Sequence, residues 1–351
     1  MFLRAGLHSR DYDRPVKSAV IFISVFGLIW SSLTLLFDFT ISREIAGEWR
    51  SRSFAETTGH VKSSKLTTSR SSRSISYIAD IVYDYSVNGR TFTASKLRYG
   101  VMFNSSRDQA QSAVDKHPVG AETPVYFDAE NPSDAVLEPG LSGVGLLTTV
   151  FITPFNVIML GLWLALVDAV RNLNPNRPAG GVPLIKRGWM TRARMPRFTA
   201  FAVGMLTLGG TSFAAIFIVG FSTKMNPSPN TAIATWCAVL GLSVFAAARR
   251  WLKIQSGVED LVLDEDTLTL TLPLTFGRKE TVRVPFSEVK AFVVESVEQR
   301  GSKGGVSYTF APAVHFKDGR KGEKLADWGS RERADSFVAW LHEKTGVPAK
   351  P

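Results

Sequence analysis

Long uncharged stretches dominate the hydropathy pattern of this chain. Four of them cover residues 18–37, 141–167, 198–221 and 231–248. Each holds about 18 residues or more, which is the length that a helix needs to cross about 30 Å of hydrocarbon at about 1.5 Å per residue. Globular cores rarely contain four uncharged runs of this length, so the pattern predicts four transmembrane helices.

A different pattern fills residues 38–140, between the first two predicted spans. Residues 78–87 alternate between apolar and polar, Asn88-Gly89 is a strong hairpin-turn signal, and residues 90–97 return as a partner strand. A helix capped by Ser105 or Ser106 is expected to run to Lys116, and 125–127 is a further short strand. Residues 51–74 are rich in Ser, Thr, Lys and Arg, so we expect a mobile loop there around a short strand at 60–66.

This region resembles the domain-of-unknown-function family 3592, which occurs in bacteria. The resemblance lies in the hairpin at 83–92, in Gly59 and Val61, and in ordered blocks at 117–120, 125–128, 131–132 and 135–140. Ala129 departs from the family, which usually has proline there. The resemblance implies a β-rich domain that leads straight into a membrane helix, and it supplies no activity or catalytic residue.

The C-terminal part, residues 249–351, contains a second β pattern. Four leucines alternate with polar residues across 268–274, and further strands are expected at 282–284, 291–297, 306–310 and 313–317. Ser330 is placed to cap an amphipathic closing helix. This layout is similar to bacterial pleckstrin-homology-like domains. The expected fold class is therefore an α-helical membrane protein with four transmembrane helices and two small β-rich (α+β) extramembrane domains.

Charge predicts the orientation. Lys and Arg total 41 against 31 for Asp and Glu, which gives a formal net charge of +10. Basic residues gather in 1–17 and in the loop 168–197, whereas the short loop 222–230 has only Lys224. The positive-inside rule then places both termini in the cytoplasm and residues 38–140 outside, in a bacterial inner membrane.

Five basic residues form a candidate site for anionic lipid, namely Arg249, Arg250, Lys253, Arg300 and Lys303. The first three follow the last span, and the other two lie in a predicted hairpin loop at 299–305. If that loop points toward the bilayer, all five could meet headgroups, each contributing about 1 kcal/mol. A solvated hairpin tip is the alternative.

Motifs of catalysis are absent from the sequence. It has no G-x-S-x-G motif, no P-loop and no dinucleotide-binding fingerprint. Its one cysteine is Cys237, and no pair of His residues has the spacing of zinc ligands. We therefore expect no enzyme activity, no cofactor, no metal site and no nucleic-acid partner. Besides the bilayer, the expected partner is an envelope protein or a cell-wall ligand at the outer domain. A membrane-embedded hydrolase, a small transporter or channel subunit, and a protein that protects against a toxin remain alternatives.

Overall fold

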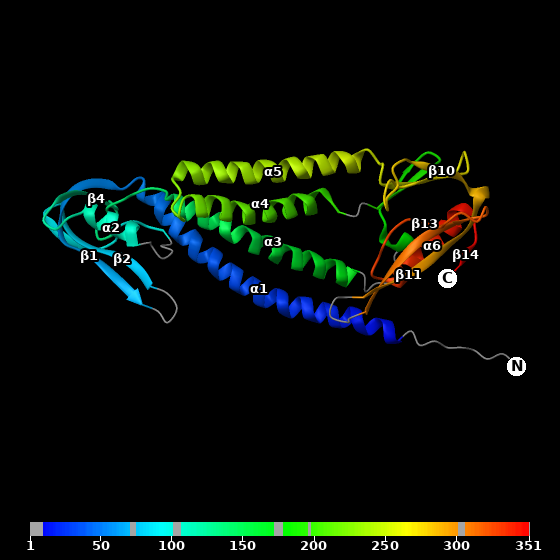
Figure 1. The fold of residues 1–351 in the computed structure, drawn as a ribbon, viewed down its shortest axis with the longest axis horizontal. Helices are drawn as coiled ribbons and strands as arrows, with labels where there is room; N and C mark the ends of the chain where they lie inside the picture. The colour runs from blue at the N-terminus through cyan, green and yellow to red at the C-terminus, as the bar shows by residue number, and fades with distance from the viewer. Residues whose placement is uncertain are drawn as a thin grey trace. The chain divides into compact units, whose positions relative to one another are not determined.

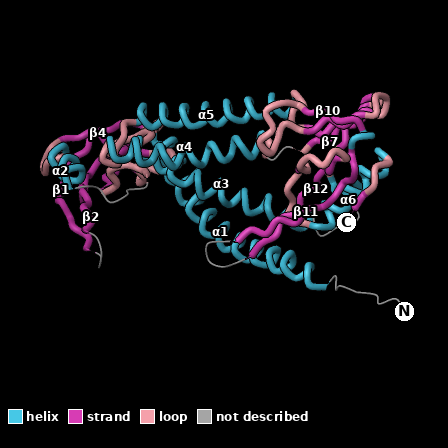
Figure 2. Tube along the Cα trace, turned by 45° about the vertical axis from the view of Figure 1, so that its right-hand side comes forward, coloured by secondary structure: helices cyan, strands magenta, loops and turns pink. Residues whose placement is uncertain are grey.

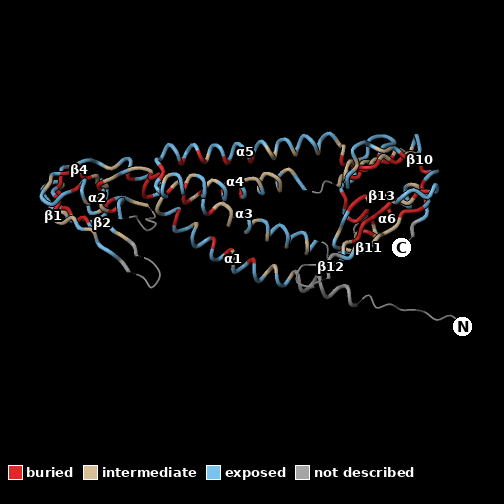
Figure 3. The backbone as a smooth tube through the Cα atoms, viewed as in Figure 1, coloured by how far each residue is buried: buried red, intermediate tan, exposed pale blue. Residues whose placement is uncertain are grey.

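Four long apolar helices organise the chain (Figure 1). The computed structural model describes residues 10–70, 75–100, 107–171, 178–195, 198–300 and 306–350. The helices are α1 (Arg10–Ser51), α3 (Gly143–Arg171), α4 (Ala200–Ser222) and α5 (Pro229–Gln255). All four are long and apolar enough to cross a membrane, and only 17% to 22% of each apolar window is buried (Figure 3). The chain is a multi-pass membrane protein, as predicted.

Helix α1 is much longer than its predicted span. The uncharged run ends at Phe37, but the helix continues to Ser51 and reaches 42 residues. Its extension has no proline, and its polar side chains are held by the domain that follows. Asp38, the first residue after the predicted span, therefore lies within the helix.

The chain divides into two compact units, and the first holds residues 28–159 and 206–243. This unit contains the N-terminal extramembrane domain, residues 52–142, whose sheet has the order β3-β2-β1-β4-β5. The strands are β1 (Ala55–Arg70), β2 (Ile75–Val87), β3 (Arg90–Ala94), β4 (Glu122–Phe127) and β5 (Ala135–Val136). The strand expected at 60–66 is confirmed and is longer than predicted, so the mobile loop expected around it is wrong for 55–59 and 67–70, which belong to the 16-residue central strand β1. Its sequence is rich in Ser and Thr, but its backbone pairs with β2 and β4 on its two sides.

The hairpin between β2 and β3 matches its prediction. Asn88 and Gly89 both adopt positive φ, at 51° and 78°, as a type I′ turn requires. Helix α2 (Arg107–Lys116) ends where expected, while the proposed caps Ser105 and Ser106 lie outside the described residues. The domain core is formed by side chains from β1, β2 and β4, among them Val61, Ile81, Tyr83 and Val125.

The second unit holds the C-terminal extramembrane domain, which contains two sheets and helix α6 (Arg331–Thr345). The strands of both sheets pair antiparallel, except for the parallel pair β11 and β14. One sheet has the order β10-β9-β8-β7-β6, from β6 (Leu184–Arg187), β7 (Met190–Arg194), β8 (Asp260–Asp264), β9 (Thr269–Leu272) and β10 (Val282–Pro285). The other has the order β13-β12-β11-β14, from β11 (Val289–Arg300), β12 (Val306–Phe316), β13 (Glu323–Lys324) and β14 (Ala349–Lys350).

Two features of this domain differ from the sequence analysis. The segment 168–197, expected as a basic loop, supplies the hairpin β6–β7, and β7 pairs with β8 along its length. The strands expected at 306–310 and 313–317 are one strand, β12, which continues through Pro312 beside β11 (Figure 2). The cap at Ser330 is confirmed, since its hydroxyl accepts a hydrogen bond from the Arg333 amide. Both sheets and α6 share one hydrophobic core.

Candidate functional site

A charged cluster lies beside helix α2 in the N-terminal extramembrane domain. The Glu138 carboxylate pairs with Arg98 at 2.6 Å and with Lys116 at 2.7 Å. The backbone holds this pairing, because the Leu97 carbonyl accepts hydrogen bonds from the amides of Leu137 and Glu138. Burial alone would raise the pKa of Glu138, but the hydrogen bond from Lys116 and the charge of Arg98 outweigh it and keep the pKa below its ordinary value. Glu138 is therefore an anion already matched by two cations at neutral pH.

A second cluster fixes the segment that carries Arg98. The Asp134 carboxylate accepts hydrogen bonds from Arg50 at 2.8 Å, from Lys96 at 2.9 Å and from the Tyr99 hydroxyl. Burial tends to raise the pKa of Asp134, but the bonds from Tyr99 and Lys96 prevail and lower it. Because Arg50 belongs to α1, this cluster ties the helix extension to residues 96–99.

The α1 extension makes a second attachment through Glu48, which is fully buried. Its carboxylate accepts hydrogen bonds from the Ser142 amide at 3.0 Å and from the Ser142 hydroxyl. That hydroxyl in turn accepts the Gly145 amide at 2.9 Å and so caps the start of α3. Glu44 adds a contact by accepting the Gly100 amide at 3.0 Å. These bonds attach the α1 extension to the start of α3 and to residue Gly100.

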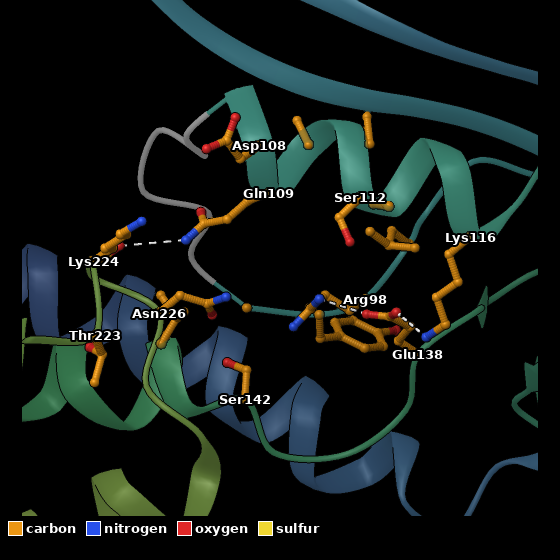
Figure 4. Close-up of a pocket in the computed structure, with 17 residues that line it drawn as sticks. Arg98, Asp108, Gln109, Ser112, Lys116, Glu138, Ser142, Thr223, Lys224 and Asn226 are labelled. Carbon is orange, nitrogen blue, oxygen red and sulfur yellow. Dashed lines mark hydrogen bonds and ion pairs between the residues drawn. The ribbon is translucent and has the colours of Figure 1, made fainter.

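A cavity of about 540 Å³ lies next to the start of α3 (Figure 4). Its lining comes from α2, from residues 97–100, from Glu138, from the first turn of α3, and from the loop between α4 and α5. Figure 4 shows the Arg98 guanidinium, the Ser112 hydroxyl and the Asn226 amide pointing into this space from different elements. Among the described residues, Ser112 and the Asn226 side chain have no hydrogen-bond partner, and Arg98 pairs only through Nη2. The cavity therefore presents spare hydrogen-bond donors.

The loop that supplies Asn226 is held in an unusual conformation. Lys224 and Met225 both have positive φ, at 51° and 59°, although neither is glycine. The Met225 amide donates to the Gly220 carbonyl at 2.7 Å, and the Asn226 amide donates to the Thr223 carbonyl at 3.0 Å. A positive φ at two consecutive residues other than glycine costs free energy, and such backbone conformations are found preferentially at functional sites. Here the turn positions Asn226 on the cavity wall.

A polar pair lies between α1 and α3. The Asn156 amide donates to the Asp38 carboxylate at 2.9 Å, and the Trp30 indole donates to the Phe155 carbonyl at 3.1 Å. These bonds satisfy polar groups close to Pro154, which interrupts the hydrogen bonding within α3.

The residues proposed to contact lipid lie in different surroundings. Arg250 donates two hydrogen bonds to Glu259, at 2.7 Å and 2.6 Å, and a third to the Phe198 carbonyl at 2.8 Å. Lys253 is half exposed and also pairs with Glu259, at 3.1 Å. Arg249 is exposed on the same helix, which continues to Gln255, beyond the predicted end of the span at residue 248. The Arg300 side chain and Lys303 lie outside the described residues.

Sequence reasoning missed the cavity residues. Arg98, Ser112 and Asn226 belong to no motif, and they lie far apart in the sequence. Only the density of polar residues in the loop at 222–230 pointed toward Asn226. Among the described residues, no group of three or more His, Cys, Asp or Glu side chains is placed to hold a metal ion.

The strands β1 to β5 and helix α2 together span the segment that a known family describes. Residues 57–142 are a DUF3592 domain, a domain of unknown function. The match covers about a quarter of the chain and ends at Ser142, the cap of α3. The predicted resemblance is confirmed for this domain. No curated protein and no solved structure matches the chain.

Proposed function

We propose that this protein is a non-catalytic membrane protein of the bacterial cell envelope, whose DUF3592 domain binds a small ligand in the cavity beside α2. The observation that carries the proposal is the set of spare donors on Arg98, Ser112 and Asn226 around one cavity. Donors that face a cavity without partners favour a ligand rich in acceptors, because an unmatched polar group costs free energy. The absence of nucleophile and phosphate-loop motifs in the sequence supports a binding role.

The proposed orientation has both termini in the cytoplasm and the DUF3592 domain outside. It is supported by the basic residues in 1–17 and 168–197 and by their scarcity in 222–230. Labelling of a Thr58→Cys variant by an impermeant thiol reagent in intact cells checks this orientation.

The proposed pleckstrin-homology-like character of the C-terminal domain is supported by its two packed sheets and closing helix α6. We also propose that Arg249 and Lys253 lie at headgroup depth. Their neighbours Trp251 and Leu252 are 53% and 61% exposed, and tryptophan and basic side chains are enriched at that depth.

Site-specific photo-crosslinking tests the binding role. A diazirine amino acid replaces Ser112, which lines the cavity, and in a matched variant it replaces Thr58, which is exposed on β1 outside the cavity lining. After irradiation in native membranes, mass spectrometry of the full chain is expected to show a small-molecule adduct at position 112 and none at position 58. The adduct should weaken in an Asn226→Ala background.

Two results would contradict the proposal. Equal labelling at the two positions, or none at position 112, would remove the cavity as a binding site. Chemical conversion of the captured molecule by the wild-type chain, lost in a variant of one polar cavity residue, would show an enzyme instead.

A further inference from the structure

The DUF3592 cavity offers hydrogen-bond donors from three separate elements. Arg98 comes from the segment after β3, Ser112 from α2, and Asn226 from the loop between α4 and α5. Arg98 uses Nη2 on Glu138 and keeps its remaining N–H groups for another acceptor. A ligand that satisfies all three elements must therefore carry several acceptor oxygens around one centre.

The charges around the cavity favour an anion. Its lining includes three cations, Arg98, Lys116 and Lys224, and two acids, Asp108 and Glu138. Glu138 is half-buried between its two cations, whereas Asp108 and Lys224 are both exposed and screened by solvent. Lys224 has no ion-pair partner among the described residues. The lining itself thus holds one cation more than acids.

Phosphate fits this arrangement better than carboxylate does. A carboxylate offers two oxygens, but a phosphate ester offers more oxygens, spread tetrahedrally, which separate elements can reach at once. The planar guanidinium of Arg98 matches a pair of phosphate oxygens. An uncharged hydroxyl and amide, such as those of Ser112 and Asn226, complete phosphate sites in many proteins.

The position of the cavity indicates where the phosphate comes from. Ser142 and Val144 in its lining mark the start of α3, and Thr223 follows the last residue of α4. The ends of transmembrane helices lie at the depth of lipid headgroups. Leu97, Ala110 and Ala113 add an apolar strip that suits a glycerol ester.

We propose that this cavity binds a phosphate-bearing group, supplied by the headgroup of an anionic lipid; the proposal rests on the ligand-binding role given above. The full chain in detergent is titrated with phosphatidylglycerol, with diacylglycerol, which lacks the phosphate, and with soluble glycerol 3-phosphate. Native mass spectrometry measures the affinity of the first molecule bound. We expect phosphatidylglycerol to bind at least tenfold more tightly than diacylglycerol.

The test variant is Ser112→Ala/Asn226→Ala, because neither side chain has a protein partner that its loss would disturb. It should lose at least tenfold in affinity for phosphatidylglycerol and none for diacylglycerol. The matched control is Lys62→Gln, which removes a cation paired with Asp84 outside the cavity lining of the same domain. It should bind like the wild type.

The outcomes separate the lipid source of the ligand from phosphate recognition itself. Glycerol 3-phosphate binding as tightly as the lipid would support phosphate recognition and overturn the lipid source. Equal affinity for the two lipids, or an unchanged double variant, would overturn the phosphate proposal. A phosphate-free adduct in the crosslinking experiment would also overturn it while leaving the binding role intact, so the two proposals fail separately.

Discussion

Arg249 and Arg250 are neighbours in the sequence, but the structure gives them opposite surroundings. Arg249 is exposed at the end of α5, whereas only 13% of the Arg250 side chain is exposed and its partner Glu259 is 8% exposed. Arg250 also reaches the Phe198 carbonyl beside α4. Arg249 is therefore exposed to its surroundings, whereas Arg250 joins α5 to the residues just before α4 and just before β8.

This contrast predicts that Arg250→Gln destabilises the C-terminal domain by about 3 kcal/mol, because Glu259 is left buried without its main partner. Arg249→Gln, the matched control, should change stability by less than about 0.5 kcal/mol. Hydrogen exchange of the β8 amides in the full chain measures both. Equal protection in the two variants would show that the pair with Glu259 contributes nothing.

The effect of Arg250→Gln should also depend on pH. The hydrogen bond from Arg250 is the main reason that the pKa of Glu259 lies below its ordinary value of 4.5. A lowered carboxyl pKa contributes stability above the unfolded-state pKa, and that contribution is lost as pH falls through the folded-state pKa. The difference between the variant and the wild type should therefore be full at neutral pH and shrink well below pH 4.5.

At the scale of elements, the extension of α1 beyond its apolar run decides how the DUF3592 domain is held. Glu44, Glu48 and Arg50 all bond to that domain. Gly47 lies on the same extension, and a Cβ there would overlap the Tyr99 ring. The glycine thus permits the close approach that brings Tyr99 to Asp134.

Gly47→Ala is accordingly expected to destabilise the chain by about 1–3 kcal/mol, because the Tyr99 ring must move. Helix propensity predicts the opposite sign, since alanine is better than glycine by about 1 kcal/mol in a helix. Gly161→Ala in α3 provides the control, because a Cβ there meets nothing within 4 Å. Thermal unfolding of both variants in the same detergent compares them. If they shift alike, the contact with Tyr99 is unimportant.

At the scale of the whole molecule, the C-terminal domain is built from two segments separated by α4 and α5. The hairpin β6–β7 precedes these helices, and its partner strand β8 follows them. Ala179, Val182 and Ala193 from the earlier segment are buried in the shared core. The domain is therefore complete only when both segments are present.

Residues 249–351 alone should consequently fold poorly, with β8 left as an open edge and part of the core exposed. A single chain that links residues 178–195 to residues 257–350 should unfold at least about 15 °C higher, as several kcal/mol are restored in a small domain. Calorimetry of the two proteins measures the difference. Equal melting temperatures would mean that the earlier segment adds no stability.

The sequence by itself determined the four spans, the Asn88-Gly89 hairpin, the DUF3592 domain and the closing helix α6. These features depend on local signals, namely apolar length, turn chemistry, ordered motif blocks and helical periodicity. Tertiary structure alone decided that the strand expected at 60–66 extends over residues 55–70 in the centre of its sheet, that α1 continues to Ser51, and that residues 184–194 belong to the C-terminal sheet. In these places the stabilising partners are distant in sequence: β2 and β4 for β1, Ser142 for Glu48, and β8 for β7. The cavity is of the same kind, because Arg98, Ser112 and Asn226 converge only when the domain packs on the loop between α4 and α5.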